Sequence, residues 1–153
     1  MPDFLIGAPY TDLHGPSSGS AHVYSGATGQ LLWRWDGLHH NEMGDSVAFC
    51  GDFDRDGRGD ILVGLPGAEA GNVLNSGSAL VFSGATGAQL FRFDSPFKGY
   101  LGRGDSVSGA GDCNGDGWPD LILGTPFAEP KGRNLAGAVD LVSGRTGLPL
   151  WYR

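Results

Sequence analysis

The chain contains the stretch Asp52-Phe-Asp54-Arg-Asp56-Gly-Arg58-Gly-Asp60, which recurs sixty residues later as Asp112-Cys-Asn114-Gly-Asp116-Gly-Trp118-Pro-Asp120. Both copies place an oxygen-bearing side chain at positions 1, 3, 5 and 9, and a glycine at position 6. Ca²⁺ takes six to eight oxygen ligands, and alternate residues of a tightly turned loop can direct their oxygens at one centre. The glycine permits a backbone turn that a Cβ would obstruct. The spacing therefore predicts a Ca²⁺-binding loop in each copy.

Each loop offers four side chains and one main-chain carbonyl, which belongs to the variable residue at position 7. In the first loop these ligands are Asp52, Asp54, Asp56, the carbonyl of Arg58, and Asp60. In the second loop they are Asp112, Asn114, Asp116, the carbonyl of Trp118, and Asp120. Because Asn114 removes one negative charge, we expect two Ca²⁺ sites, of which the second is the weaker.

The acidic loops belong to a longer repeat. The segment Asp60-Ile-Leu-Val-Gly-Leu-Pro66 matches residues 120–126 and residues 3–9, and a Ser-Gly-x-Thr-Gly turn begins at Ser25, Ser83 and Ser143. From Asp3 to Asp60 to Asp120 the period is 57 to 60 residues. Self-similarity at such a period is typical of solenoids, propellers and arrays, in which one unit cannot bury its faces alone.

Within each unit the apolar runs are short. In the second unit they are residues 46–50, 61–63, 78–82 and 89–93, separated by Gly, Pro, Asn and Asp. No window shows a sustained apolar period of 3.6 residues, so strands are favoured over helices. Four short strands joined as a meander are typical of one propeller blade. We predict an all-β partial β-propeller of about three four-stranded antiparallel blades.

The repeat boundaries divide this arc into residues 1–43, 44–101 and 102–153. The first blade is predicted to lack its inner strand, because Asp3 stands at the ninth position of a loop whose first eight residues are missing. Propellers close with four or more blades. We therefore expect either a fragment of a longer protein or copies that associate to complete a ring, and the fragment is favoured.

Strand composition indicates how the blades pack. The runs Ile61-Leu-Val63 and Leu121-Ile-Leu123 are apolar at every position, as expected of strands covered on both faces. The fourth strand of each unit places aromatic residues on one face, as in Trp33-Arg34-Trp35 and Phe91-Arg92-Phe93. This aromatic stripe is predicted to pack between blades and not to form a ligand platform.

Composition excludes several classes of protein. The chain has 10 Lys and Arg against 17 Asp and Glu, a formal net charge of −7, which disfavours nucleic acid and anionic membrane surfaces. No run approaches the ~20 apolar residues of a membrane span, and the start at Met1-Pro2-Asp3 has no signal-peptide pattern. The two cysteines, Cys50 and Cys113, occupy non-equivalent repeat positions, which predicts free thiols.

Two Arg-Gly-Asp triplets and one pair of histidines could indicate adhesion or metal binding, but each is better explained by its place in the repeat or its exposure to solvent. The triplet Arg58-Gly59-Asp60 ends in a predicted Ca²⁺ ligand, and Arg103-Gly104-Asp105 arises from the repeat's own Gly-Asp-Ser-Val segment, so neither is expected to act as an adhesive tag. The pair His39-His40 near Glu42 lacks a third ligand at a recognisable spacing and is expected to be solvated.

The run Gly44-Asp-Ser-Val-Ala, the acidic loop and Asp60-Ile-Leu-Val-Gly-Leu-Pro66 together resemble the FG-GAP repeat, the blade unit of integrin α-subunit propellers and of many bacterial extracellular proteins. The resemblance extends over nearly the whole chain. Met43 and Arg103 stand where the family often has phenylalanine, and Leu65 and Thr125 replace the alanine retained at Ala8.

The resemblance implies a seven-bladed propeller when complete, with Ca²⁺ on one face and ligands on the other. It implies a non-catalytic scaffold, outside the cell or at its surface, that binds protein or carbohydrate. The loops expected at the ligand face are residues 10–18, 67–76 and 127–136, together with 36–43 and 95–103. No catalytic motif for hydrolysis or phosphate binding occurs in the sequence.

Three alternatives remain. The segment from Ser25 to Trp33 is similar to the docking turn of quinoprotein propellers, which are dehydrogenases or assembly scaffolds, but those blades lack the acidic loop. Some FG-GAP relatives carry the propeller beside a hydrolase or phospholipase domain. A carbohydrate-binding propeller assembled from short chains is the third alternative.

Overall fold

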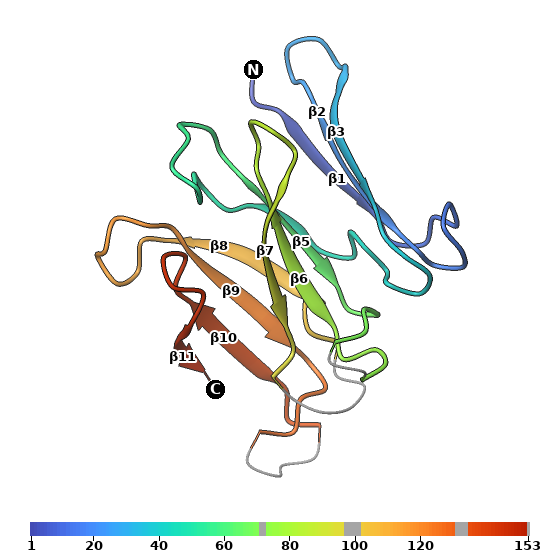
Figure 1. The fold of residues 1–153 in the computed structure, drawn as a ribbon, viewed down its shortest axis with the longest axis vertical. Coiled ribbons are helices and arrows are strands. Elements are labelled where there is room, and N and C mark those ends of the chain that lie inside the picture. The colour runs from blue at the N-terminus through green and yellow to red at the C-terminus, as the bar shows by residue number, and fades with distance from the viewer. Residues whose placement is uncertain (71–72, 97–101, 131–134, 153) are drawn as a thin grey trace.

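A computed structural model describes residues 1–70, 73–96, 102–130 and 135–152. The regular structure in these ranges consists of eleven β-strands without an α-helix. Three separate antiparallel sheets follow one another along the molecule, and the first and last sheets lie at opposite ends (Figure 1). No helix in the described residues has the length and apolar character needed to cross a membrane.

The first sheet has three strands and the other two have four. The first contains β1 (Phe4–Ala8), β2 (Ser20–Tyr24) and β3 (Leu31–Asp36). The second contains β4 (Val47–Phe49), β5 (Ile61–Leu65), β6 (Ser78–Phe82) and β7 (Gln89–Asp94). The third contains β8 (Ser106–Gly111), β9 (Asp120–Thr125), β10 (Ala138–Val142) and β11 (Pro149–Tyr152).

Each strand pairs with its neighbour in the sequence, so every sheet is a meander. The predicted fold is confirmed: the chain is an all-β partial propeller in which each sheet is one blade and the first blade lacks its inner strand. All three sheets fall inside the predicted units 1–43, 44–101 and 102–153, whose boundaries stay predictions. Of the loops expected at the ligand face, residues 71–72, 97–101 and 131–134 lie outside the described residues.

The three blades repeat in register as well as in order. Ile6, His22 and Arg34 lie side by side in the first sheet. Val63 and Leu80 occupy the same two inner positions in the second sheet. The register shifts by one residue at the same place in every blade, where the last strand pairs with the one before it. A repeated bulge bends the outer strand as it leaves the Ser-Gly-x-Thr-Gly turn.

The second blade is covered on both faces, and the side chains of β5 alternate between two hydrophobic clusters. Ile61, Val63 and Leu65 pack toward the first sheet. Leu62 packs toward the third sheet with Val81 of β6. All five residues of β5 are buried, which confirms the prediction of a strand covered on both faces. Each such side chain contributes about 1.5–3 kcal/mol to folding by leaving water.

The corresponding strand of the third blade differs from the prediction. Leu121 and Leu123 are fully buried against the second sheet, but Ile122 is 39% exposed. Successive strand residues point to opposite faces, so Ile122 lies on the face of the third sheet that no other described sheet covers. Ile122 is apolar, so this face is suited to packing against another sheet. No described sheet covers it in this structure.

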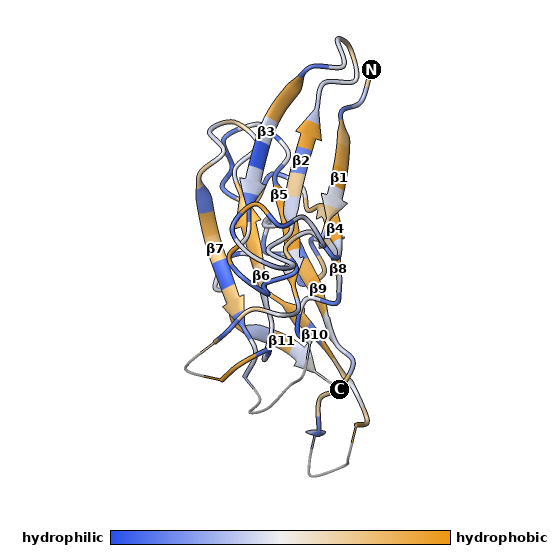
Figure 2. Ribbon diagram, turned by 90° about the vertical axis from the view of Figure 1, so that its right-hand side faces the viewer, coloured by the Kyte–Doolittle hydropathy of each residue, from blue (hydrophilic) through white to orange (hydrophobic). Residues whose placement is uncertain are grey.

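Aromatic residues of the first sheet pack on the β6–β7 turn of the second, as predicted. The indole Nε1 atoms of Trp33 and Trp35 donate hydrogen bonds to the carbonyls of Gly84 (3.0 Å) and Gly87 (2.8 Å). Trp35 also stacks on Phe82, with ring centroids 4.5 Å apart. Figure 2 shows the alternation of apolar and polar residues along β3 and β7 that this packing requires. The stripe is therefore an inter-blade contact.

The inner edges of adjacent blades approach through glycine. A Cβ on Gly7 would lie 1.9 Å from the carbonyl oxygen of Gly44, and a Cβ on Gly64 would lie 1.8 Å from that of Gly104. The first glycine of each pair belongs to the Gly-x-Pro segment of one blade, and the second lies just before the inner strand of the next. Only glycine fits at Gly7 and Gly64, because any Cβ there would overlap the neighbouring backbone. The Gly-x-Pro segment of one blade and the Gly-Asp segment of the next therefore form one backbone contact between blades.

The two ends of the strands carry different loops. The β4–β5 and β8–β9 connections, which contain the acidic loops, lie on the left of Figure 1, whereas β1, β5 and β9 all run toward its right-hand and lower side, where their connections to the next strands begin. The Ser-Gly-x-Thr-Gly turns share the acidic end, since Gly84 donates a hydrogen bond to Asp60. The acidic loops thus occupy the face opposite the longer loops.

Candidate metal centre in the acidic loops

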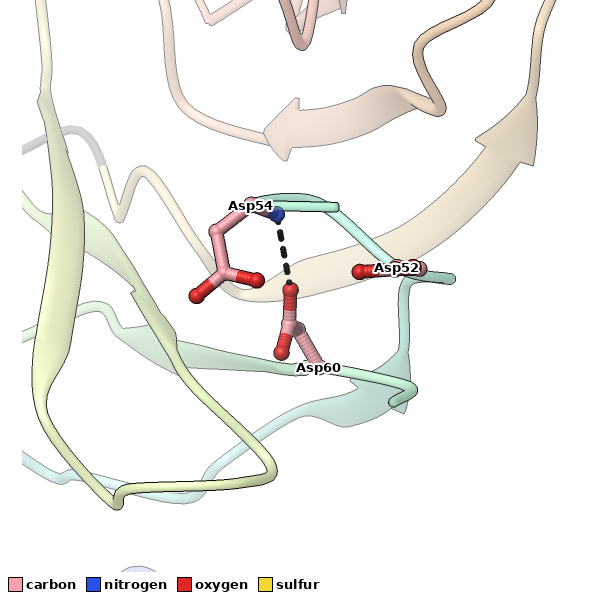
Figure 3. A group of neighbouring side chains, drawn as sticks. All are labelled: Asp52, Asp54 and Asp60. Carbon is pink, nitrogen blue, oxygen red and sulfur yellow. Dashed lines mark hydrogen bonds between the residues drawn. The ribbon is translucent and has the colours of Figure 1, made fainter. Parts of the chain in front are cut away.

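The first acidic loop connects β4 to β5 and gathers three carboxylates. Oxygen atoms of Asp52, Asp54 and Asp60 all lie within 4.8 Å of one another (Figure 3). The chain turns tightly enough for this because Gly57 takes a φ of +91° and Arg55 a φ of +65°. Like charges at this spacing repel one another, so the arrangement favours a cation between them.

Asp60 at the start of β5 is fully buried and ties the loop together. Its Oδ2 accepts hydrogen bonds from the backbone N–H groups of Phe53 (2.6 Å) and Asp54 (3.2 Å), and its Oδ1 accepts one from Gly84 (2.9 Å). Burial raises the pKa of the Asp60 carboxyl, while the three N–H groups act in the opposite direction. Asp60 therefore joins the loop to the β6–β7 turn.

Asp52 at the other end of the loop is only half satisfied. Its Oδ2 accepts a hydrogen bond from the N–H of Gly57 (2.9 Å). Its Oδ1 is buried and has no hydrogen-bond partner among the described residues. A buried carboxylate oxygen without a partner is costly. Because the unpaired atom belongs to the three-carboxylate group, the residues fit a bound cation.

The structure brings together three of the four predicted side-chain ligands of this loop. Asp56 is exposed and lies outside the group of three. One of its oxygens accepts a hydrogen bond from the N–H of Arg58 (2.9 Å), and the other lies 3.5 Å from the hydroxyl of Ser83. Asp56 thus remains a predicted ligand. Like Asp60, it lies next to the β6–β7 turn, which contains Ser83 and Gly84.

The second acidic loop has the same framework with different side-chain partners. Asp120 is fully buried; its Oδ2 accepts from the N–H of Cys113 (2.9 Å) and its Oδ1 from Gly144 (3.1 Å). Asp112, however, accepts three backbone hydrogen bonds through its two oxygens. The Asn114 amide donates to Asp116 (3.1 Å).

The carboxylates of the second loop do not form a three-member group like that of the first loop. Asn114 explains part of the difference, because an amide can hydrogen-bond to Asp116 where a third aspartate would repel it. Trp118, the predicted carbonyl ligand, donates its N–H to Asp116 (3.0 Å). The first loop is therefore the better-formed candidate centre.

The first blade keeps one part of this framework. Asp3 Oδ1 accepts a hydrogen bond from the N–H of Gly26 (3.0 Å), as Asp60 and Asp120 do from Gly84 and Gly144. The aspartate at position 9 thus anchors the Ser-Gly-x-Thr-Gly turn in all three blades. Sequence reasoning assigned it only to the metal, although its recurrence beside the recurring turn was a signal for this second role.

Both Arg-Gly-Asp triplets are built into the fold, as expected. Asp60 of the first is fully buried and hydrogen-bonded within the loop. Arg103 of the second is 4% exposed and forms a buried ion pair with Asp140 of β10. An adhesive tag needs both charged ends accessible, and each triplet has one end buried.

The remaining polar motifs form no metal group among the described residues. The rings of His39 and His40 contact each other edge to face, with centroids 4.0 Å apart, and neither belongs to a cluster of three candidate ligands. Both cysteines are free, as predicted: Cys113 is exposed, whereas burial raises the pKa of the Cys50 thiol to about 12.

An acidic group at the start of the inner strands was not predicted. Burial raises the pKa of Glu42, and Asp45 raises it further. Burial likewise raises the pKa of Asp45, with repulsion from Asp105 of the next blade as the second cause. The signal was the recurrence of Gly-Asp in Gly44-Asp45 and Gly104-Asp105, which places the two aspartates on adjacent blades.

A cavity of about 470 Å³ lies between the outer strands of the second and third sheets. Its lining includes Phe93, Arg103, Asp140 and Pro149. Ligand sites in proteins commonly combine apolar walls with a few charged groups in a volume of this size. The lining runs from Asp94, at the end of β7 away from the acidic loops, to Gly147 in the turn at the acidic end.

Comparisons with known proteins agree with this architecture. Residues 103–142 match the FG-GAP repeat. The chain is 32% identical over 139 residues to mouse integrin alpha-E, which covers 80% of the chain and 12% of that relative. It is 39% identical over 89 residues to human integrin alpha-IIb, with 56% of the chain and 8% of the relative covered.

A third relative extends the match along the chain. Integrin alpha pat-2 of Caenorhabditis briggsae is 30% identical over 162 residues, which cover 93% of the chain and 12% of the relative. The chain thus spans about an eighth or less of the length of these relatives. The repeated blade, the glycine contacts between blades and these matches show that the chain is an FG-GAP repeat protein with integrin α-like repeats.

Proposed function

We propose that this chain is a calcium-stabilised, integrin α-like β-propeller scaffold that binds an extracellular partner and has no catalytic role of its own. The observation that carries the proposal is the unpaired buried oxygen of Asp52 inside the group formed with Asp54 and Asp60. A hard divalent cation satisfies that oxygen and neutralises the repulsion among the carboxylates. Ca²⁺ fits better than Zn²⁺, which favours His and Cys ligands.

In the proposed first site, Asp52, Asp54 and Asp60 hold the ion, with Asp56 and the carbonyl of Arg58 as further ligands. In the second, Asp112, Asn114, Asp116, the carbonyl of Trp118 and Asp120 have these roles. Bound Ca²⁺ supplies positive charge that fixes the loop between the first and second strands of a blade. Asp60 is already joined to the β6–β7 turn. Fixing the loop therefore orders both connections at this end of the second blade, β4–β5 and β6–β7.

The proposed role is structural, since the acidic loops lie on the face opposite the longer loops. We propose that a protein or carbohydrate partner binds on that opposite face, where the loops differ most between blades. The net charge of −7 supports a partner other than nucleic acid. We propose that the remaining blades of the ring come from a longer chain or from associated copies of this one.

A location outside the cell or at its surface fits the proposed sites. Extracellular Ca²⁺ modules commonly have dissociation constants of about 10⁻⁴–10⁻³ M, which suits loops with one or two exposed ligands. Asp54 and Asp56 are both exposed. Similarity to proteins named integrin alpha supports the same location.

The first test is thermal unfolding of the chain with EDTA and with increasing Ca²⁺. Binding to the folded state adds about 2.7 kcal/mol at a hundred-fold excess of ligand over the dissociation constant, so the melting temperature should rise steadily with Ca²⁺. Mg²⁺ at the same concentration should have less effect, because it demands a smaller octahedral site. A melting temperature that changes with neither EDTA nor Ca²⁺ would contradict the proposal.

Substitution separates the two sites. Asp52→Asn keeps the shape of the side chain and removes the charge, so calorimetry with Ca²⁺ should lose the stronger of two binding events and keep the weaker. Asp12→Asn is a matched control, because Asp12 lies in the β1–β2 loop at the opposite end of the strands and bonds only to Ser17 among the side-chain contacts described. It should leave both events unchanged.

A further inference from the structure

The two acidic loops contact each other across the boundary between the second and third blades. The guanidinium carbon of Arg55 lies 5.1 Å from the ring centroid of Trp118, within the range of a cation–π interaction. Arg55 sits between two proposed ligands of the first loop, Asp54 and Asp56. Trp118 is the residue whose carbonyl is a proposed ligand of the second loop. One side-chain contact therefore joins the two candidate centres.

A buried connection runs beneath that contact. The N–H of Phe53 bonds to Asp60 at 2.6 Å, and the Phe53 side chain is only 2% exposed. Its ring lies against the turn of the third blade, where a Cβ on Gly144 would come within 3.0 Å of Phe53 Cε2. Gly144 in turn donates its N–H to Asp120 at 3.1 Å. The anchoring aspartates of the two loops are thus linked through one ring and one turn.

The backbone of the first loop is strained at the contact residue. Arg55 has a φ of +65°, a left-handed conformation that is unfavourable for a residue with a Cβ, and the equivalent position in the second loop is occupied by Gly115 at +75°. In the proposed site, a cation bound at Asp54, next to Arg55, would stabilise this conformation. It would thereby also favour the position of the guanidinium over Trp118.

We infer, on the basis of the proposed function, that the two loops bind Ca²⁺ cooperatively and that the Arg55–Trp118 contact carries the coupling. Ordering by the first ion lowers the entropic cost of binding the second. The coupling is reciprocal by thermodynamic linkage. Given the usual strength of an exposed cation–π contact, occupancy of either loop should raise the affinity of the other about two- to five-fold.

Repulsion between the two ions acts in the opposite direction. Its range is limited to about 8 Å at 0.15 M ionic strength, so the measurements belong at that salt concentration or above. Removing Arg55 also removes a positive charge, which strengthens Ca²⁺ binding to each loop separately. The coupling must therefore be measured as a ratio of affinities within each background.

The experiment is calorimetric titration of the full chain with Ca²⁺ alone. Asp112→Asn and Asp52→Asn leave one working loop each and give the intrinsic affinity of the first and second loop. In the unsubstituted chain, the product of the two stepwise binding constants should exceed the product of the intrinsic values by about two- to five-fold. The same three titrations are then made with Arg55→Ala present, in the chain with both loops and in each single-loop variant. In this background the ratio should fall to one.

Arg145→Ala is the matched control, since it makes the same change of residue and charge on the turn beside the second loop. Alanine already stands at the equivalent positions, Ala27 and Ala85. The two- to five-fold ratio should persist in this background. Far-ultraviolet circular dichroism of every variant at saturating Ca²⁺ checks that the sheets are formed.

The outcomes separate the two proposals. A ratio of one in the unsubstituted chain, or a ratio that survives Arg55→Ala, overturns the coupling while leaving two Ca²⁺ sites in place. Absence of Ca²⁺ binding by the unsubstituted chain overturns both. If Asp52→Asn prevents folding, Trp118→Leu tests the same contact from the other loop, and its stepwise constants should show the lower product without any loss of a carboxylate.

Discussion

At the scale of single residues, one backbone conformation recurs in three different surroundings. The last glycine of the Ser-Gly-x-Thr-Gly turn has a φ of +71° at Gly29, +71° at Gly87 and +70° at Gly147. A Cβ on Gly29 would meet no atom within 4 Å, whereas one on Gly147 would lie 3.3 Å from Phe91. On Gly87 it would lie 2.4 Å from the Trp33 ring. The three positions therefore separate backbone strain from steric conflict.

Alanine at these three positions should destabilise the protein in the order of those distances. The left-handed conformation costs about 1–2 kcal/mol for any residue with a Cβ, and Gly29→Ala should show this cost alone. Gly87→Ala should lose a further 1–3 kcal/mol, roughly the cost of overpacking, because Trp33 has to move. Urea unfolding measures each difference. A loss at Gly87→Ala equal to that at Gly29→Ala would contradict the packing of Trp33 on this turn.

The residue scale also shows what the acidic pattern could and could not predict. The spacing predicted converging oxygens in both loops; those of Asp52, Asp54 and Asp60 converge, whereas Asp56 and the carboxylates of the second loop form no such group. The hydrogen bond from Gly84 to Asp60 could not be predicted from local spacing, because it joins residues 24 apart through the fold; only the recurrence of the aspartate with the turn pointed to it. The local spacing of residues determines the loop. Its anchoring depends on the order of the strands, which places the β6–β7 turn beside the loop.

At the scale of whole elements, the two inter-blade contacts differ at one pair of equivalent positions. Between the first and second sheets, Met43 and Leu80 belong to an apolar cluster. Between the second and third sheets, the same repeat positions hold Arg103 and Asp140, which form a buried ion pair. The Arg103 Nε is also buried and has no partner among the described residues. Such pairs often contribute less than apolar side chains of similar volume.

Replacing the pair by the residues of the other contact should therefore not weaken the fold. Arg103→Met combined with Asp140→Leu should be neutral or stabilising by about 1–4 kcal/mol, whereas either change alone should cost about 3–5 kcal/mol by leaving one buried charge unpaired. Arg34→Met is the control, since its partner Asp36 is exposed and such pairs contribute about 0–1 kcal/mol. Free energies from urea unfolding give all four values. A double variant as unstable as the single variants would show that the pair is needed.

Strand order and strand type could be predicted at this scale, and the ion pair could not. Apolar runs between turn residues fixed the meander, and the alternation along β3 and β7 fixed which face is buried. Arg103 was interpreted as part of an Arg-Gly-Asp triplet and as a departure from the family's phenylalanine, not as half of an ion pair. Its partner is 37 residues away on β10, and only the register of the third sheet against the second brings the two together.

At the scale of the whole molecule, three blades give two buried contacts between sheets and two uncovered faces. Trp33 and Trp151 occupy equivalent positions beside Val23 and Leu141 in their sheets. Trp33 packs on the β6–β7 turn of the next blade and donates a hydrogen bond to Gly84. Trp151 is 50% exposed, because no described sheet follows the third. The same residue type is thus half-enclosed in one blade and open in another.

This difference predicts the last pair of variants. Trp33→Ala should lower the free energy of unfolding by about 2–4 kcal/mol, since it removes a packed ring and leaves the Gly84 carbonyl without its donor. Trp151→Ala should change it by about 0.5 kcal/mol or less, as is usual for exposed side chains. Urea unfolding at two protein concentrations, with light scattering of the same samples, measures both the stability and the mass. Equal losses for the two variants, or a loss at Trp151 that depends on concentration, would show that another copy of the chain covers the open face in solution.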